Sequence, residues 1–277
     1  MLNVPQSEIE DNVIAALRED IGSGDITAEL IPEDSITLAS VITREPCVLS
    51  GMDWFEEVFR QLDEEIFIEW NVDDGDSIDA DETLCSISGP ARAILTGERT
   101  ALNFVQTLSA TATLAAKYAA AVEGTGVIVL DTRKTIPGLR LAQKYAVSCG
   151  GCQNHRLGLY DAILIKENHI AAHGSINGAV EEARFLQPDT MIEVEVENLN
   201  EFKQAFDSGA HRILLDNFSL DDMRSAVVLN AGNIELEASG NVTLDTIRAI
   251  ADTGVNFIST GALTKDIKAI DLSMRFL

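Results

Sequence analysis

The chain has 277 residues, of which 46% are hydrophobic, and it carries a formal net charge of -25 at pH 7. That length suits one large α/β domain with a smaller companion, and the acidity argues against a general nucleic-acid binder, because phosphate backbones bind broad faces of clustered Lys and Arg. No stretch is apolar for long enough to span a bilayer and no signal-like segment opens the chain, so the expected location is the cytoplasm.

The first third of the sequence predicts a small α+β domain. Ser7 and Glu10 form an S-x-x-E pattern that predicts a capping box, and apolar residues follow at helical spacing. The GSGD turn at 22–25 should end this helix. Beyond it, the pattern predicts strands within 36–51, a helix over 52–62, a strand over 65–70, a hairpin-type turn at Gly75 and a strand over 83–87.

The turn around Gly75 is similar to the turn-rich pattern of biotinyl and lipoyl carrier modules. No lysine stands at this turn to carry a cofactor, so a structural half-barrel is favoured. A non-catalytic carrier or binding protein is kept as a remote alternative.

A long helical segment should follow the first domain. Pro90 can occupy the first position of a helix, and helical spacing continues to Gly124, with a break allowed at Gly97. Within it, Glu98 and Arg99 are expected from the sequence alone to form a solvent-facing ion pair. We expect an N-terminal α+β sandwich domain with this connecting helix over 1–115, joined by the C-terminal tail 267–277, and a catalytic domain over 116–266.

From Val127 onward, short strands rich in Val, Ile and Leu alternate with amphipathic helical segments. Six strands are expected, beginning near residues 127, 161, 191, 212, 234 and 256, with helices over 175–186, 199–208, 220–229 and 243–251. Repeated βα units indicate a parallel sheet. No G-x-G-x-x-G follows the first strand and the strands fall short of eight, so the predicted fold class is α/β, as an incomplete (β/α) barrel.

Cations concentrate in the stretch from Leu130 to Ile170. It contains, within an acidic protein, Arg133, Lys134, Arg140, Lys144, His155, Arg156, Lys166 and His169. A patch of one sign inside a cleft focuses the field and attracts anions. The same stretch holds a C-x-x-C, Cys149 and Cys152, which is interpreted as a flexible loop with two reduced thiols rather than a redox or zinc site.

Polar residues end each predicted strand. They are Asp131, Lys166, Glu195 with Glu197, Asp216, Glu237 with Ser239, and Thr260. In a βα barrel the C-terminal strand ends surround one mouth, where the chemistry occurs. Glu193, Glu195 and Glu197 alternate along one strand and so share a face. Carboxylates in a barrel lumen need cations or a metal, and the cations of 130–170 are available.

Two glycine-bearing turns follow the last two strands, at 239–243 and 259–262. Exposed N–H groups at the start of a helix bind phosphate, and in barrels the late turns are the usual place. The sequence therefore predicts phosphate binding there.

These residues resemble the quinolinate phosphoribosyltransferase family, also called nicotinate-nucleotide pyrophosphorylase. The likeness covers nearly the whole chain, through GDITAELIPE, GERTALN, LDTRKTIPGLR, NHR, IKENH, EVEVEN, LLDNFS, EASGNV and FISTGALTK. It implies a pentosyltransferase of NAD biosynthesis that is magnesium-dependent and moves the phosphoribosyl group of phosphoribosyl pyrophosphate to quinolinate with decarboxylation. It also implies a homodimer whose sites are completed by the partner.

The resemblance assigns roles to individual residues. Substrate binding falls to Thr132, Arg133, His155, Arg156 and, from the partner subunit, Arg99. The reacting centre falls to Lys134 and Lys166, with the role of each lysine left open, while Glu195 and Asp216 match the carboxylates near ribose and magnesium. Phosphate binding falls to Ser239, Gly240, Asn241, Gly261 and Ala262. A related type II phosphoribosyltransferase acting on nicotinate or another acid remains the alternative, although three arginines favour a dicarboxylate.

Overall fold

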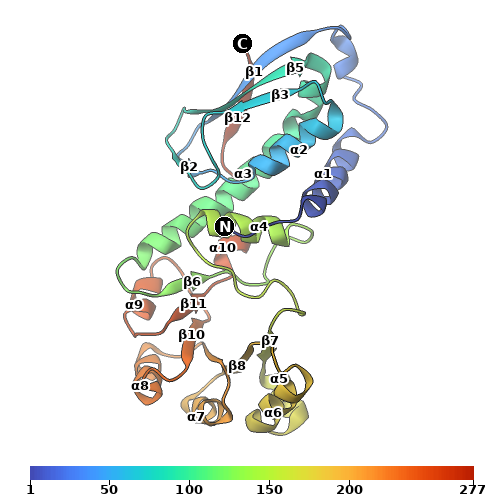
Figure 1. Ribbon diagram of the computed structural model, residues 1–277. Helices are drawn as coiled ribbons and strands as arrows, with labels where there is room; N and C mark the ends of the chain where they lie inside the picture. The colour runs from blue at the N-terminus through green and yellow to red at the C-terminus, as the bar shows by residue number, and fades with distance from the viewer. The chain divides into compact units, whose positions relative to one another are not determined.

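The structure is a computed structural model that describes residues 1–277 and divides them into two units (Figure 1). Unit 1 comprises Met1–Ala116, Thr135–Gly151 and Asp266–Leu277, and unit 2 comprises Lys117–Lys134 and Cys152–Lys265. Helix α3 (Ala91–Ala121) begins in unit 1 and ends in unit 2. A search of the helices for one long and apolar enough to cross a membrane finds none.

Unit 1 is built on an antiparallel sheet of four strands. Their order is β12 (Leu272–Phe276), β1 (Ile36–Thr43), β5 (Thr83–Pro90) and β3 (Phe67–Trp70). The unit also contains α1 (Gln6–Ile21), η1 (Ala28–Leu30), β2 (Cys47–Val48), α2 (Met52–Leu62), β4 (Ser77–Ile78) and α4 (Arg140–Cys149).

The core of unit 1 forms where α2 turns its aromatic face inward. Trp54, Phe55 and Phe59 are buried in one apolar cluster with Leu84 of β5 and Leu102 of α3. Burying each such side chain contributes roughly 1.5–3 kcal/mol. The helix predicted over 52–62 is therefore confirmed, and the amphipathic spacing that predicted it supplies the core.

Several local predictions in unit 1 are wrong. Helix α1 starts at Gln6 with Pro5 as its N-cap and no side-chain cap, because the carbonyl of Pro5 already accepts the N–H of Glu8 at 3.0 Å. Ser7 thus lies inside the first turn, and the predicted capping box is not formed. The connection from β3 to β5 is also more than a hairpin, because β4 intervenes and pairs with β2.

The long helix begins later than predicted and is not interrupted. Pro90 is the last residue of β5, and α3 runs unbroken from Ala91 through Gly97. A Cβ at Gly97 would lie 2.7 Å from side-chain atoms of both Phe59 and Leu62. The glycine therefore permits α2 to pack closely on α3 and does not break the helix.

The C-x-x-C segment leaves a helix at its first cysteine and continues as a turn, so the predicted loop begins after Cys149. Cys149 is the last residue of α4, and a Cβ at Gly150 would collide with Ala112 and Ala115 of α3. Both cysteines are buried free thiols. Close packing against a helix explains the glycine better than flexibility does.

Unit 2 contains a parallel sheet of six strands with open ends. The order is β6 (Ile128–Leu130), β11 (Phe257–Ser259), β10 (Glu235–Ser239), β9 (Arg212–Asp216), β8 (Ile192–Val196) and β7 (Ile163–Ile165). All neighbours are parallel, while β6 and β7 occupy opposite edges. The six predicted strands and the incomplete barrel are confirmed.

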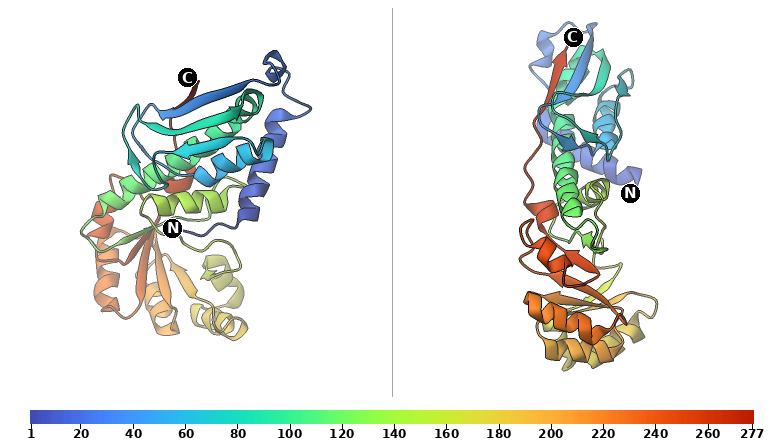
Figure 2. Two further views of the ribbon diagram at one scale, coloured as in Figure 1. Left: turned by 45° about the horizontal axis from the view of Figure 1, so that its top comes forward. Right: turned by 90° about the vertical axis from the view of Figure 1, so that its left-hand side faces the viewer.

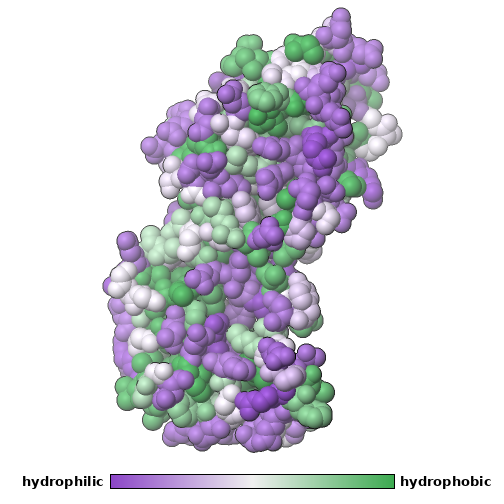
Figure 3. Space-filling model, in the orientation of Figure 1, coloured by the Kyte–Doolittle hydropathy of each residue, from purple (hydrophilic) through white to green (hydrophobic).

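Helices follow the strands of unit 2 from β7 onward. They are α5 (Glu167–His173), α6 (Ile176–Leu186), α7 (Leu199–Ser208), α8 (Leu220–Asn230), α9 (Ile247–Ala251) and α10 (Ala262–Lys265). Figure 2 shows the helices after β8 and β9, α7 and α8, running along the outer side of the sheet. They do not cover the ends of the strands. Much of the face drawn in Figure 3 is hydrophilic, in keeping with the net charge of -25.

Candidate active site

A pocket of about 340 Å³ lies among the C-terminal strand ends of unit 2. Its lining is largely cationic and polar: Thr132, Arg133, Lys134, His155, Arg156, Leu164, Lys166, Glu195, Leu214, Glu237, Ser239 and Ser259. Eight of the residues selected from the sequence thus line one cavity. The convergence at the carboxyl edge of the sheet is the arrangement expected of a βα fold.

The remaining predicted site residues lie outside this lining. Asp216 ends β9 opposite Ser239 of β10, and Gly240 and Asn241 follow in the next turn. The second turn, at 261–262, follows β11. Arg99 lies in α3 within unit 1, where it is exposed and forms no ion pair with Glu98.

Two guanidinium groups line the pocket and give it positive charge. Burial, together with the charge of nearby Arg133, lowers the pKa of Arg156. The Nη1 of Arg156 donates to the carbonyl of Ala162 at 3.2 Å, which fixes the direction of the side chain. Two neighbouring cations repel one another, and an anion bound between them would offset this repulsion.

Lys166 and Glu195 form an ion pair at the ends of β7 and β8. The Nζ of Lys166 donates to Oε2 of Glu195, whose side chain is only 12% exposed. The N–H of Lys166 donates to Nδ1 of His169 at 3.0 Å, at the start of α5. The predicted pairing of strand carboxylates with cations from 130–170 is confirmed here.

Lys134 is held by its main chain next to the second glycine turn. Its carbonyl accepts the hydroxyl of Thr264 at 2.8 Å, and a Cβ on Gly261 would lie 2.8 Å from its Cδ. Glycine at 261 therefore lets the turn approach the lysine closely.

The first glycine turn and Asn217, the residue after β9, have an unusual backbone. Asn217, Gly240 and Asn241 all adopt positive φ, at 55°, 95° and 51°. Nδ2 of Asn241 donates to Oδ1 of Asn217 at 3.1 Å, and Nδ2 of Asn217 donates to Asp216 at 2.8 Å. A Cβ at Gly240 would collide with the Asn217 side chain, so a glycine is required there.

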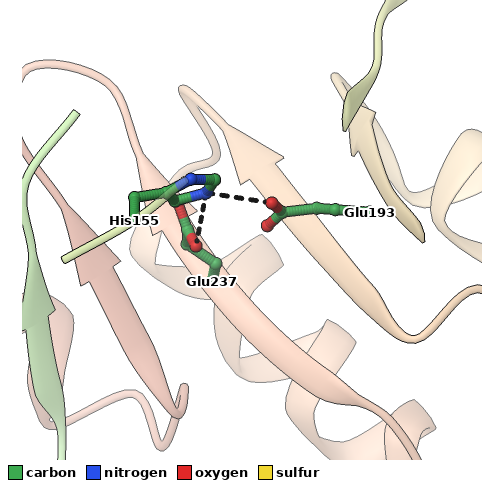
Figure 4. Close-up of side chains that lie close together, drawn as sticks. All are labelled: His155, Glu193 and Glu237. Carbon is green, nitrogen blue, oxygen red and sulfur yellow. Dashed lines mark ion pairs between the residues drawn. The ribbon is translucent and has the colours of Figure 1, made fainter. Parts of the chain in front are cut away.

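His155 lines the pocket and lies against two buried carboxylates (Figure 4). Its Nε2 is 3.0 Å from Oε2 of Glu193 and 3.5 Å from Oε2 of Glu237, and both glutamates are 0% exposed. Nη1 of Arg212 lies 3.4 Å from Oε2 of Glu237 on the other side. The lumen carries a network of charges where a structural barrel would carry aliphatic side chains.

Opposing influences act on the protons of this cluster. Burial acts to lower the pKa of His155, whereas the two neighbouring carboxylates favour its charged form and act to raise the pKa. Burial also raises the pKa of Glu193. However, Nδ1 of His155 accepts the amide N–H of Arg156 at 2.8 Å, which requires a lone pair on Nδ1 and places the ring proton on Nε2. The main chain sets the direction of this amide, so the neutral ring carries its proton on Nε2.

Two groups of residues could hold a metal. His155, Glu193 and Glu237 bring three ligand atoms within 4.8 Å of one another, but they already contact each other at ion-pair distances, with Arg212 beside Glu237. Glu195 and Asp216 offer only carboxylate oxygens on neighbouring parallel strands. That second set suits a hard cation such as Mg²⁺.

Sequence reasoning did not assign Asp131, Glu193 or Glu237 to the site. Asp131 is fully buried, and Oδ1 accepts the N–H of His155 at 2.9 Å while Oδ2 accepts Nδ2 of Asn154 at 2.7 Å. The signal was present in the polar strand ends and in the alternation of glutamates, but the spacing could not say which carboxylate meets which cation.

Two family models match consecutive parts of the chain. The N-terminal domain of quinolinate phosphoribosyl transferase matches residues 25–109, and its C-terminal domain matches residues 111–275. The chain belongs to the quinolinate phosphoribosyl transferase family. Among curated proteins, the probable nicotinate-nucleotide pyrophosphorylase (carboxylating) of Bacillus subtilis is 41% identical over 257 residues, which cover 92% of this chain and 89% of that protein.

Solved structures of this family are similar over the whole chain. The nicotinate-nucleotide pyrophosphorylase of Francisella tularensis has a TM-score of 0.97 and 49% identity, covering 99% of this chain and 98% of that one. NadC of Streptococcus pyogenes has a TM-score of 0.96 and 39% identity, covering 100% of both chains. The resemblance to quinolinate phosphoribosyltransferases is thus confirmed.

Proposed function

We propose that this member of the quinolinate phosphoribosyl transferase family moves the phosphoribosyl group of phosphoribosyl pyrophosphate to quinolinate with loss of one carboxylate. The products are nicotinate mononucleotide, pyrophosphate and CO₂, in NAD biosynthesis. The observation that carries the proposal is the pocket in which Arg133 and Arg156 lie with Lys166 and Glu195.

Quinolinate fits the cations of this pocket. It carries two adjacent carboxylates on a planar ring, and guanidinium groups bind carboxylates through two parallel hydrogen bonds where a lysine offers a point charge. Arg133 and Arg156 would bind these carboxylates, with Thr132 and His155 beside them. A monocarboxylate such as nicotinate would leave part of this charge uncompensated.

Phosphoribosyl pyrophosphate would occupy the strand ends beyond the arginines. Its phosphates would accept N–H groups from the turns at Ser239–Asn241 and Gly261–Ala262. Mg²⁺ would be held by Glu195 and Asp216 together with substrate oxygens, and when bound it supplies neutralisation of the pyrophosphate charge.

The chain's own residues would then act on the developing charges. As the ring nitrogen bonds to C1′ and the bond to pyrophosphate breaks, positive charge builds on the ribose, where Glu195 and Asp216 stabilise it. Loss of the carboxylate next to the quaternary nitrogen leaves an electron pair on that ring carbon. Lys134 or Lys166 would deliver the proton that this carbon then takes up.

Substrate choice tests the proposal. Purified protein is incubated with phosphoribosyl pyrophosphate, magnesium and either quinolinate or nicotinate. We expect turnover of quinolinate and little of nicotinate. Turnover of nicotinate alone would instead support the related type II phosphoribosyltransferase.

A shared active site in a homodimer forms the second part of the proposal. Arg99 is exposed and unpaired on α3, which suits a role in the pocket of a partner subunit.

The four cysteines are free thiols, which suits the reducing cytoplasm.

Complementation tests the shared site. In an equimolar mixture of Arg99→Ala and Lys134→Ala chains, half of randomly formed dimers are heterodimers with one intact site each, so about a quarter of wild-type activity should return. The matched control mixes Arg99→Ala with the Arg99→Ala/Lys134→Ala double variant, which should restore nothing. Verified heterodimers without activity would show that each site is self-contained.

A further inference from the structure

Glu193 and Glu237, the two buried carboxylates that lie against His155, have no role in the chemistry just described. The three residues come from the loop before β7 and from β8 and β10, and Figure 4 shows all three side chains pointing at one another. Both side-chain oxygens of Glu193 and Oε1 of Glu237 are buried without a hydrogen bond, so Glu193 meets His155 at ion-pair distance only. Two carboxylates taken out of water cost several kcal/mol unless paired, so contacts with His155 and Arg212, and for Glu237 also with Ser259, offset this cost.

The other edge of the same imidazole is attached to the substrate pocket. Nδ1 of His155 accepts the amide N–H of Arg156 at 2.8 Å. A neutral imidazole donates from one nitrogen and accepts at the other, and the partner of the donor decides which is which. The carboxylates at Nε2 therefore select the tautomer that the main chain of Arg156 requires.

Hydrogen bonds to Asp131 also hold the segment from Asn154 to Arg156. Asp131 accepts the N–H of His155 at 2.9 Å and the side-chain amide of Asn154 at 2.7 Å. Glu193 and Glu237 hold the imidazole of His155, and Asp131 holds the backbone. The main chain at Arg156, from which its side chain extends, therefore has little freedom to move. Preorganisation of this kind reduces the entropy lost on binding.

We propose that Glu193 and Glu237 are positioning residues, which hold His155 through Nε2 so that its Nδ1 fixes the main chain of Arg156 at the acid-binding pocket. The proposal rests on the proposed function, in which Arg156 binds quinolinate. A metal in the cluster is the competing explanation, and the ion-pair distances of 3.0 and 3.5 Å from Nε2 favour direct contact.

The first test replaces each buried carboxylate by its amide. For Glu193→Gln and Glu237→Gln we expect the KM for quinolinate to rise about tenfold or more, because misplacement of a binding group by a fraction of an ångström weakens its contacts. The KM for phosphoribosyl pyrophosphate should stay within about twofold, since the phosphate turns do not depend on His155.

Glu235→Gln is the matched control. Glu235 lies two residues before Glu237 on β10 and pairs with the same arginine, Nη2 of Arg212 to Oε2 at 2.9 Å, but its side chain is 54% exposed and has no contact with His155. This variant should leave both KM values unchanged. An equal rise in it would mean that Arg212 alone matters, which would overturn the proposal.

Coupling to Arg156 separates positioning from a general structural role. In an Arg156→Ala background, Glu237→Gln should no longer change the KM for quinolinate, because both act through one group. The same fold-change in both backgrounds would contradict the proposal. His155→Asn, whose Oδ1 can replace Nδ1 as acceptor, should retain more affinity than His155→Gln.

The ¹⁵N signals of His155 give a readout that needs no turnover. We expect a protonated Nε2 and an unprotonated Nδ1 at neutral pH, changed in Glu193→Gln. An imidazolium, or one equivalent of metal retained by the wild type and lost from this variant, would overturn the proposal even if quinolinate is the substrate. A wild type with the expected tautomer but no quinolinate turnover would instead refute the proposed function and the role of the cluster in acid binding, while the His155–Arg156 contact would stand.

Discussion

Replacing Arg133 by alanine is expected to raise the KM for quinolinate about a hundredfold or more. The side chain lines the pocket beside Arg156, and its fork would make two hydrogen bonds to one carboxylate, each worth roughly 1.5–3 kcal/mol when charged. Arg133→Lys should fall between the two, because a lysine keeps the charge but loses the planar fork. Steady-state kinetics with quinolinate varied at saturating phosphoribosyl pyrophosphate measures the effect.

Arg224 is a suitable control for this experiment. It lies on α8 of the same unit, its side chain is 52% exposed, and it pairs only with Asp221 at 2.8 Å. Surface pairs of this kind contribute little, so Arg224→Ala should keep wild-type kinetics. If Arg133→Ala behaved like Arg224→Ala, quinolinate would have to bind elsewhere.

Replacing Lys166 by alanine is expected to lower kcat about a thousandfold, with a smaller change in the KM for quinolinate. Lys166 pairs with Glu195 at the reacting end of the pocket, so its loss removes a cation from the decarboxylating centre and leaves a carboxylate without its partner. Single-turnover measurements separate the two chemical steps. Accumulation of quinolinate mononucleotide in this variant, and not in Lys134→Ala, would assign the decarboxylation step to Lys166.

The control is Lys203→Ala, an exposed lysine on α7. It tests whether the loss of any positive charge from so acidic a protein affects turnover. A kcat for Lys166→Ala within about fivefold of wild type would exclude Lys166 from the chemistry.

The barrel could be predicted from the sequence because its signal is periodic and repeated. The strands of unit 2 are short segments rich in Val, Ile and Leu with polar residues at their C-terminal ends, such as Asp216 at the end of β9, and amphipathic helical segments separate them. Such patterns depend on neighbours along the chain, so they survive without knowledge of the tertiary structure.

What failed depended on contacts between distant residues. The predicted capping box at Ser7 does not form, because the carbonyl of Pro5 accepts the N–H of Glu8 and the helix begins earlier. Gly97 suggested a helix break, but close packing of α2 on α3 needs a glycine there. At the site, alternation placed Glu193 and Glu195 on one face, but could not say that one pairs with His155 and the other with Lys166. The register between strands decides which glutamate meets which cation, and local sequence patterns do not reveal that register.

The proposed reaction is tested most directly by following one carboxylate carbon of the substrate. Quinolinate labelled with ¹³C in the carboxylate next to the ring nitrogen is incubated with the protein, phosphoribosyl pyrophosphate and magnesium, and labelled CO₂, pyrophosphate and nicotinate mononucleotide are measured together. We expect the three products in equal amounts, and none in the absence of phosphoribosyl pyrophosphate. Pyrophosphate release with the label retained in the nucleotide, or no reaction at all, would contradict the proposed reaction.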